Sequence, residues 1–216
     1  MNFSVLFVAL LMSGAALAAG TAKVNGSISV EAGQAAGDVS TVNGSIRLAD
    51  RATAREVSTV NGSVKLGEQA QAESLSTVNG QIQMAAGAKV KNDATLVNGT
   101  IVLDKGAEVG GDVSSVNGRI QLDAAHVGGN VETVMGSVLI GADSRIDGDL
   151  RVKKPKGMWF GGSGSEPTRV VIGPRATITG KLKFERPVKL YVSSSARVGA
   201  IEGAEPIRFN GDRPPG

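Results

Sequence analysis

The only histidine of this 216-residue chain, His126, is the first residue to consider for acid–base chemistry. Acyltransferases built on hexapeptide β-helices use a histidine as a general base, and a lone histidine in a repetitive chain invites that comparison. His126 lies between Ala125 and Val127-Gly128, and no other feature of the chain marks an acyl-donor site. We therefore expect His126 to be a surface or corner residue whose hydrogen bonds are satisfied within the structure.

The acidic residues are scattered rather than gathered in a cluster. Glycoside hydrolysis needs two carboxylates at a defined separation, and the spacing shows no such pair. Asp112, Asn130 and Asp149 occupy equivalent positions of successive repeats; they could form an oxygen-rich column for calcium, or simply a solvated turn. The chain has no cysteine, so it forms no disulfide. We predict that the chain is not an enzyme and has no catalytic, cofactor-binding or metal-binding residues.

The element that must position any functional side chain is a short repeat. The tripeptide Val-Asn-Gly recurs along the first two-thirds of the chain and becomes Val-Met-Gly in its last copy. Its copies begin at Val24, Val42, Val60, Val78, Val97, Val116 and Val134, in steps of 18, 18, 18, 19, 19 and 18 residues. A period this short indicates a solenoid made by stacking one small unit.

Each tripeptide is followed by two aliphatic residues on either side of a variable one, as in Ile46-Arg47-Leu48. Alternation with period 2 predicts a strand with one buried face. Such a repeat is too short for a helical hairpin but fits one turn of a β-solenoid, in which parallel strands stack about 4.8 Å apart. We predict an all-β, single-domain parallel β-helix of about ten coils of 18–19 residues, three-sided and right-handed.

The asparagines of the tripeptides are expected to stack on one another. Asn tolerates left-handed backbone geometry, the following Gly tolerates positive φ, and stacked Asn side chains can hydrogen-bond from coil to coil. We expect this ladder to stabilise the fold rather than to bind a ligand. Its predicted members are Asn25, Asn43, Asn61, Asn79, Asn98 and Asn117.

A column of threonines precedes the tripeptides. Its members are Thr41, Thr59, Thr77 and Thr133. Ice-binding solenoids carry Thr-x-Thr arrays, whereas this chain has one Thr per coil, followed by the Val of the tripeptide, which we expect to point inward. An ice-binding face is therefore not expected.

Composition divides the chain into segments. The predicted segments are a signal peptide (1–18), regular coils (19–152), an excursion loop (153–168), terminal coils (169–208) and a disordered tail (209–216). The first segment has an apolar run followed by an Ala-x-Ala triplet, which predicts cleavage after Ala18. The regular coils contain neither proline nor an aromatic residue, because proline removes a ladder hydrogen bond and a thin interior has little room for rings.

The predicted signal peptide determines the compartment. We expect a periplasmic or extracellular protein, in which nucleic acid is not a partner. The apolar run is too short to span a bilayer, so no transmembrane segment is expected in the mature chain.

Positive charge is concentrated in residues 151–191, which contain ten basic and two acidic residues. This local charge of +8 exceeds the +3 of the whole chain, so the remainder carries −5. Such a patch can attract an anionic envelope polymer or lipid surface, although solubility and protection of strand edges explain it equally well. The candidate interaction residues are Lys153, Lys154, Lys156, Trp159, Phe160 and Arg169.

Three short motifs mark corners in the second half of the repeats: Gly110-Gly111-Asp112-Val113, Gly128-Gly129-Asn130-Val131 and Asp147-Gly148-Asp149-Leu150. Interleaved with Ile-Gly and Val-Asn-Gly corners, they resemble the bactofilins, which are bacterial polymer-forming cytoskeletal proteins. The resemblance covers residues 107–203 best. It implies a right-handed, three-sided β-helix that polymerises end to end without nucleotide and has no catalytic residues. Bactofilins act in the cytoplasm or at its membrane face, so the export signal is a departure from the family.

Together these patterns favour an exported, non-enzymatic structural or scaffold β-solenoid of the bacterial envelope. The alternative is a glycan-binding or glycan-active β-helix protein. Self-association is expected at the coil ends, which carry unpaired backbone groups. Only Lys23 lies just before the first tripeptide, whereas Pro206 and Arg208 guard the C-terminal end. We therefore expect a head-to-head dimer through the N-terminal coil, although the bactofilin resemblance implies filaments.

Overall fold

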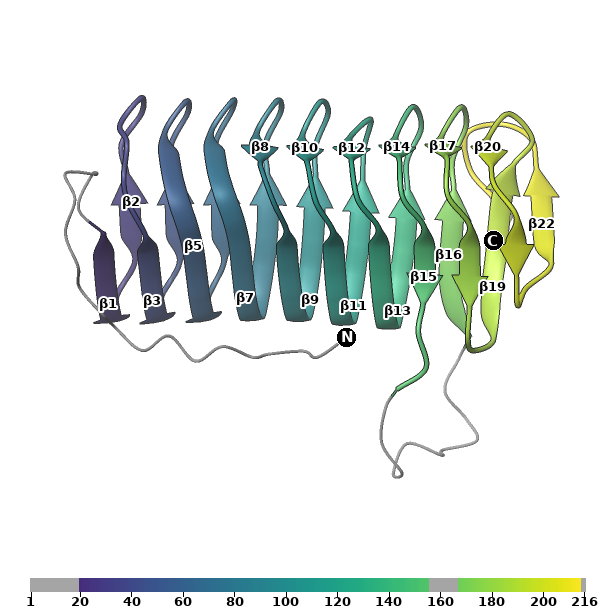
Figure 1. The fold of residues 1–216 in the computed structure, drawn as a ribbon, viewed down its shortest axis with the longest axis horizontal. Coiled ribbons are helices and arrows are strands. Elements are labelled where there is room, and N and C mark those ends of the chain that lie inside the picture. Colours follow the sequence, from purple (N-terminus) through teal and green to yellow (C-terminus); the bar gives the residue numbers. More distant parts are fainter. Residues whose placement is uncertain (1–19, 156–166, 215–216) are drawn as a thin grey trace.

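The computed structural model of the protein describes residues 20–155 and 167–214. The regular elements in these two ranges are all strands, and the strands pair in parallel from coil to coil. Figure 1 shows the coils following one another along the long axis of the molecule. The predicted all-β solenoid is confirmed, with about nine turns where we expected about ten. Its right-handed sense stays a prediction.

Each turn contributes to three stacks of parallel strands, which we call the first, second and third faces. The first face consists of β1 (Thr21–Asn25), β3 (Val39–Asn43), the last part of β5 (Thr53–Asn61), the middle of β7 (Gln71–Met84), the first parts of β9 (Ala94–Leu103), β11 (Val113–Leu122) and β13 (Val131–Ile140), then β15 (Leu150–Val152), β18 (Leu182–Phe184) and β21 (Ile201–Glu202). The second face consists of β2 (Ile28–Val30), β4 (Ile46–Leu48), β6 (Val64–Leu66), the last parts of β7, β9, β11 and β13, then β16 (Thr168–Ile172), β19 (Val188–Ser193) and β22 (Pro206–Phe209).

The third face is made of very short strands. It consists of β8 (Lys89–Val90), β10 (Glu108–Val109), β12 (His126–Val127), β14 (Arg145–Ile146), β17 (Thr177–Ile178) and β20 (Arg197–Val198). In the first coils the starts of β5 and β7 and a bridge between Ala35 and Thr53 take its place. The three stacks agree with the predicted three-sided cross-section.

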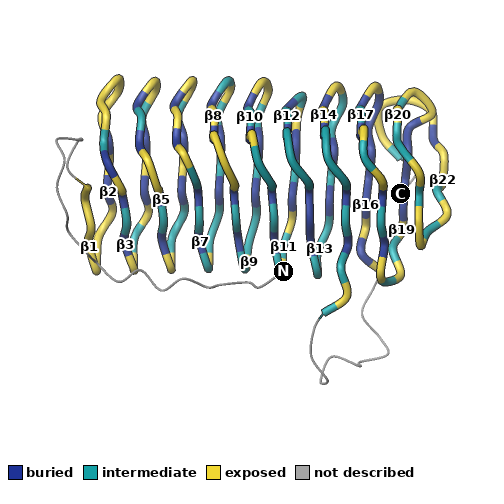
Figure 2. The backbone as a smooth tube through the Cα atoms, in the orientation of Figure 1, coloured by how far each residue is buried: buried dark blue, intermediate teal, exposed yellow. Residues whose placement is uncertain are grey.

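The core is a set of straight apolar columns that run along the inside of the solenoid. On the second face, Ile46 stacks on Val64 and Leu48 stacks on Leu66, and these side chains are buried. Arg47, which lies between Ile46 and Leu48 in β4, points outward, as the period-2 pattern predicts. Figure 2 shows buried positions recurring from coil to coil, separated by exposed positions in the first coils and by intermediate ones in the later coils.

The orientation that we expected for the tripeptide Val was wrong. Val42 and Val60 are 40% and 39% exposed, whereas Thr41 and Thr59 are buried. Side chains alternate along β3, and Val39 points inward. Thr41, two residues later, therefore faces the core, and Val42 faces outward. The buried Thr59 hydroxyl donates a hydrogen bond to the Gly44 carbonyl at 3.0 Å, which satisfies its polar group inside the coil.

The corner glycine is required because successive coils come very close there. A Cβ atom on Gly62 would lie 1.9 Å from the carbonyl oxygen of Gly44, and one on Gly99 would lie 1.7 Å from that of Gly80. Backbone atoms of the preceding coil cannot move aside without breaking the strand pairing. Any side chain at this corner is therefore excluded by the stacking itself.

The repeat continues after the insertion, in agreement with the terminal coils that we predicted over residues 169–208. Ile140 pairs with Ile172, Ile146 with Ile178 and Leu150 with Leu182. At the C-terminal end, Phe209 differs from our expectation of a disordered tail: it ends β22 and is buried in a small cluster with Val171 and Tyr191 on the outside of the second face.

The close approach at the corner predicts a strong effect of Gly62→Ala. The added methyl group would meet rigid backbone, so we expect a loss of about 3 kcal/mol in the free energy of unfolding, measured by urea denaturation. Gly26→Ala is the matched control, because it has nothing within 4 Å of the added Cβ and only its φ of +104° to strain. That variant should lose about 1 kcal/mol. Equal losses for the two variants would contradict the stacking argument.

Candidate functional site: polar columns on the solenoid surface

Five asparagines form a continuous amide ladder along the corner between the first and second faces. The Nδ2 of each asparagine donates to the Oδ1 of the asparagine one coil earlier, and all four bonds measure 3.0 Å. The ladder runs through Asn25, Asn43, Asn61, Asn79 and Asn98. These side chains are exposed at the corner, so their hydrogen bonds join neighbouring coils on the surface of the molecule.

The sixth predicted member, Asn117, pairs with Asn98 in the backbone register. The described side-chain bonds of the ladder nevertheless end at Asn98. The next position of the column is Met135, which has no amide to continue it. Sequence spacing therefore identifies the column but not the point at which the ladder ends.

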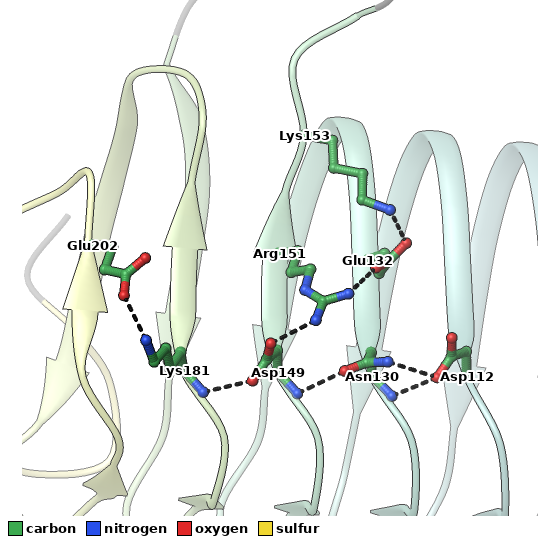
Figure 3. Close-up of polar contacts among 8 residues, drawn as sticks. All are labelled: Asp112, Asn130, Glu132, Asp149, Arg151, Lys153, Lys181 and Glu202. Carbon is green, nitrogen blue, oxygen red and sulfur yellow. Dashed lines mark hydrogen bonds and ion pairs between the residues drawn. The ribbon is translucent and has the colours of Figure 1, made fainter. Parts of the chain in front are cut away.

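A second ladder follows the corners of the Gly-Gly-Asp motifs (Figure 3). Asp112 Oδ1 accepts a hydrogen bond from the backbone N–H of Asn130 at 2.7 Å, and Asn130 Oδ1 accepts one from Asp149 at 2.9 Å. Asp149 Oδ1 in turn accepts from the backbone N–H of Lys181 at 2.8 Å. That bond, together with the Arg151 guanidinium, holds the pKa of Asp149 below its usual range.

The glycine before each Asp or Asn makes room for this second ladder. A Cβ atom on Gly129 would lie 2.3 Å from Asp112 Oδ1, and one on Gly148 would lie 2.7 Å from Asn130 Oδ1. The motif that carries the bactofilin resemblance thus has a local structural cause. Its oxygens are engaged with backbone donors, and no group of three or more His, Cys, Asp or Glu side chains in residues 20–155 and 167–214 could hold a metal ion.

His126 lies in a column of charged residues on the third face. Its Nε2 is 2.8 Å from Asp147 Oδ2, and its Nδ1 is 3.9 Å from Glu108 Oε1. Lys89 is 2.9 Å from Glu108 on one side, and Arg145 binds Asp147 at 2.6 Å on the other. The two ring nitrogens therefore face carboxylates of different coils, which is an arrangement that ties coils together.

These partners also affect the carboxylates. The Lys89 hydrogen bond lowers the pKa of Glu108, and burial opposes it only in part. The hydrogen bond from His126, followed by that from Arg145, lowers the pKa of Asp147. Both carboxylates are thus held in the charged form as part of a structural network.

The positive charge of residues 151–191 is partly neutralised by acids from neighbouring coils. Figure 3 shows Glu132, whose side chain is 6% exposed, between Arg151 and Lys153. Arg151 binds Glu132 at 2.9 Å and Asp149 at 2.6 Å. The hydrogen bonds that Arg151 donates to Asp149 and then to Glu132 raise its pKa. Counting charge along the sequence therefore overstates the field of this surface.

Two further pairs follow the same rule. Arg175 makes two hydrogen bonds of 2.7 Å to Asp143, which lower the pKa of that carboxyl. Lys181 is 3.1 Å from Glu202 in the next coil. In each case the acid comes from the coil next to that of the base.

The predicted interaction residues do not form one site in the part of the chain that the structure describes. Lys153 follows β15 on the first face and contacts Glu132, and the backbone N–H of Lys154 donates to Glu185 at 3.0 Å. Arg169 lies in β16 on the second face, with its guanidinium 4.9 Å from the ring centre of Tyr191. The other three are Lys156, Trp159 and Phe160, which lie outside the described residues.

Two residues without a predicted role stand out once the register between coils is known. Glu132 pairs with Ser114 and so stands at a position that is serine in several earlier coils. Lys23 stands in the inward threonine column, since it pairs with Thr41. Aligning the repeats by column identifies both residues. Lys23 is a charged residue at the start of an uncharged column, and Glu132 is the first charged residue of a column that continues with Arg151.

Two open depressions lie on the surface of the described residues. One of about 400 Å³ lies among Asp38, Arg55, Glu56, Glu73 and Ser74, where Arg55 is already paired with Asp38 at 2.9 Å. Another of about 400 Å³ lies between Pro174-Arg175 and the serines at the end of β19. Neither of these two depressions is lined by an aromatic side chain of the kind that stacks on sugars.

No family model, curated protein or solved structure matches the chain. The resemblance to the bactofilins thus rests on the short corner motifs alone. Within the described ranges, no helix is both long enough and apolar enough to cross a membrane.

The amide ladder predicts that Asn61→Ala lowers stability without affecting any surface binding. The substitution removes the bond to Asn43 and the bond from Asn79, so we expect a loss of about 1 kcal/mol in the free energy of unfolding, measured by thermal and urea denaturation. Asn117→Ala is the matched control outside the side-chain ladder and should cost less. If the two variants lose the same stability, the ladder bonds contribute nothing measurable.

The lowered pKa of Asp147 predicts a pH-dependent contribution to stability. Because the folded-state pKa is depressed, the carboxylate stabilises fully above its unfolded pKa of about 3.9, and the effect is lost as the pH falls through the lower folded value. The stability difference between the parent and Asp147→Asn should therefore be larger at about pH 5 than at about pH 2, and it should shrink as the pH falls between these values. Asp104→Asn serves as a control without an ion pair among the described contacts. A difference for Asp147→Asn that stays constant down to pH 2 would refute the linkage.

Proposed function

We propose that the protein is an exported, non-enzymatic structural element of the bacterial envelope that acts as a rigid scaffold or spacer. The observation that supports this most directly is the use of its polar columns. The Asn ladder, the Asp and Asn corner ladder and most of the ion pairs connect a residue with a neighbouring coil. Side chains committed in this way stiffen the stack of coils and leave few groups for chemistry.

The same observations weigh against the glycan-active alternative. Hydrolysis needs one carboxyl group to donate a proton and another to act as base or nucleophile. Asp112 and Asp149 accept backbone hydrogen bonds, while Asp147 is bound by His126 and Arg145. The depressions described above also lack an aromatic platform for a sugar ring.

Attachment to the envelope is assigned to the basic residues near the insertion. Lys153, Lys154 and Arg169 flank residues 156–166 on two adjacent faces, and an anionic polymer or lipid headgroup layer is the partner that their charge fits. Export itself rests on the Ala-x-Ala triplet that ends at Ala18.

The first test of this function is the location of the protein and its N-terminus. Fractionation of the native organism, followed by mass spectrometry, should find the chain outside the cytoplasm and beginning at Ala19. A full-length chain that begins at Met1 and stays in the cytoplasm would rule out the envelope role.

A second test asks whether function resides in the repeat or in one coil. Deleting residues 45–62 removes one 18-residue coil in register, and the variant should fold, shorten by about 4.8 Å in X-ray scattering and still sediment with anionic vesicles as the parent does. Deleting 45–53 is the control that breaks the register and should unfold the stack. Release of soluble fragments from purified peptidoglycan by the parent would favour the glycan-active alternative instead.

A further inference from the structure

The first strand of the solenoid departs from its columns at both inward positions. In β1, Thr21 pairs with Val39 and Lys23 pairs with Thr41. Val39 and Thr41 are buried, whereas Thr21 and Lys23 are exposed at the end of the stack. Residues in register project from the same side of a sheet, so Lys23 occupies a core position of the first coil.

Lys23 also has a defined partner. Its Nζ donates a hydrogen bond to the backbone carbonyl of Ser27 at 3.1 Å. The side chain therefore reaches from β1 across the corner to the residue just before the buried Ile28. The ammonium group of Lys23 thus lies at the end of the core, in the column where the next coil has the buried hydroxyl of Thr41.

The last strand departs from its columns in the same way. In β22, Pro206 pairs with the buried Leu190, and Arg208 pairs with the buried Val192. Proline has no backbone N–H to extend the ladder, and arginine places a charge where earlier coils have an aliphatic side chain. Both ends therefore carry residues that an interior coil does not use at these positions.

Joining two copies would bring these residues into the core. A second copy stacked head to tail in register would place Ile28 against Pro206 and Val30 against Arg208, because β2 would follow β22. A head-to-head contact would bring two Lys23 side chains together. Burying an unpaired cation is unfavourable, which opposes both arrangements.

We propose that Lys23, Pro206 and Arg208 cap the two ends of the solenoid, so that no second copy of the chain extends it. Inward-pointing charges and prolines are known means of protecting sheet edges, and solenoids need atypical terminal repeats to stay soluble. This assignment replaces our expectation of an unguarded N-terminal coil and a head-to-head dimer. It concerns assembly alone and does not depend on the proposed role in the envelope.

The proposal is tested by replacing the three capping residues with the residue types of the neighbouring coil. The triple variant Lys23→Thr, Pro206→Leu, Arg208→Val gives each position the residue found one coil further in. The parent should be a monomer at all concentrations in size-exclusion chromatography with light scattering. The triple variant should form species whose mass rises with concentration and that appear as filaments in negative stain.

A matched control separates end capping from a general loss of charge. Arg47→Val with Lys65→Thr also removes two cations, but at outward positions of the second face, and this variant should stay monomeric. A parent that is itself a dimer or filament would overturn the proposal, and this result does not depend on whether any variant folds. A triple variant that is folded by circular dichroism yet remains monomeric would overturn it as well. Lys23→Arg, which keeps the charge, should behave as the parent.

Discussion

Parallel stacking of one coil directly on the next, about 4.8 Å apart, is the constraint from which the other features of this molecule follow. Each side chain has its column neighbours immediately before and after it, so a residue type succeeds only if it tolerates its own kind at that distance. Aliphatic residues do so by packing, and asparagine does so because its amide both donates and accepts. At the closest corner only glycine remains, because a Cβ atom on Gly62 would lie 1.9 Å from a carbonyl oxygen.

Several charged residues satisfy the same constraint by pairing with opposite charges. On the third face Lys89 pairs with Glu108, Arg145 pairs with Asp147, and His126 lies between these two acids. On the first face, Glu132 lies between the cations of Arg151 and Lys153 in the same manner. Net charge along a segment of sequence is thus a poor guide to the surface of a solenoid, since the relevant neighbours are about 18 residues away.

The period and the alternation of apolar residues were sufficient to predict the β-solenoid, its three faces and its resumption after the insertion. They could not orient the tripeptide Val, because Thr and Val both suit a strand and only the register shows that Thr41 faces the core. They also could not show where the amide ladder ends, since Asn117 has the same neighbours in sequence as Asn98. Side-chain pairing between coils depends on small differences of geometry that a repeat pattern averages out.

Repetition also explains why the exceptions are more informative than the consensus. A stack held together by identical contacts has no internal reason to stop, because every coil presents the surface that the next one needs. Termination must therefore come from residues that break a column on its inward side while leaving the preceding pairing intact. Thr21 and Lys23 at one end, and Pro206 and Arg208 at the other, meet this requirement, since each pairs with its neighbour in register and offers a poor surface for continuing the core. In such a fold the information about size and assembly resides in the few positions that do not repeat.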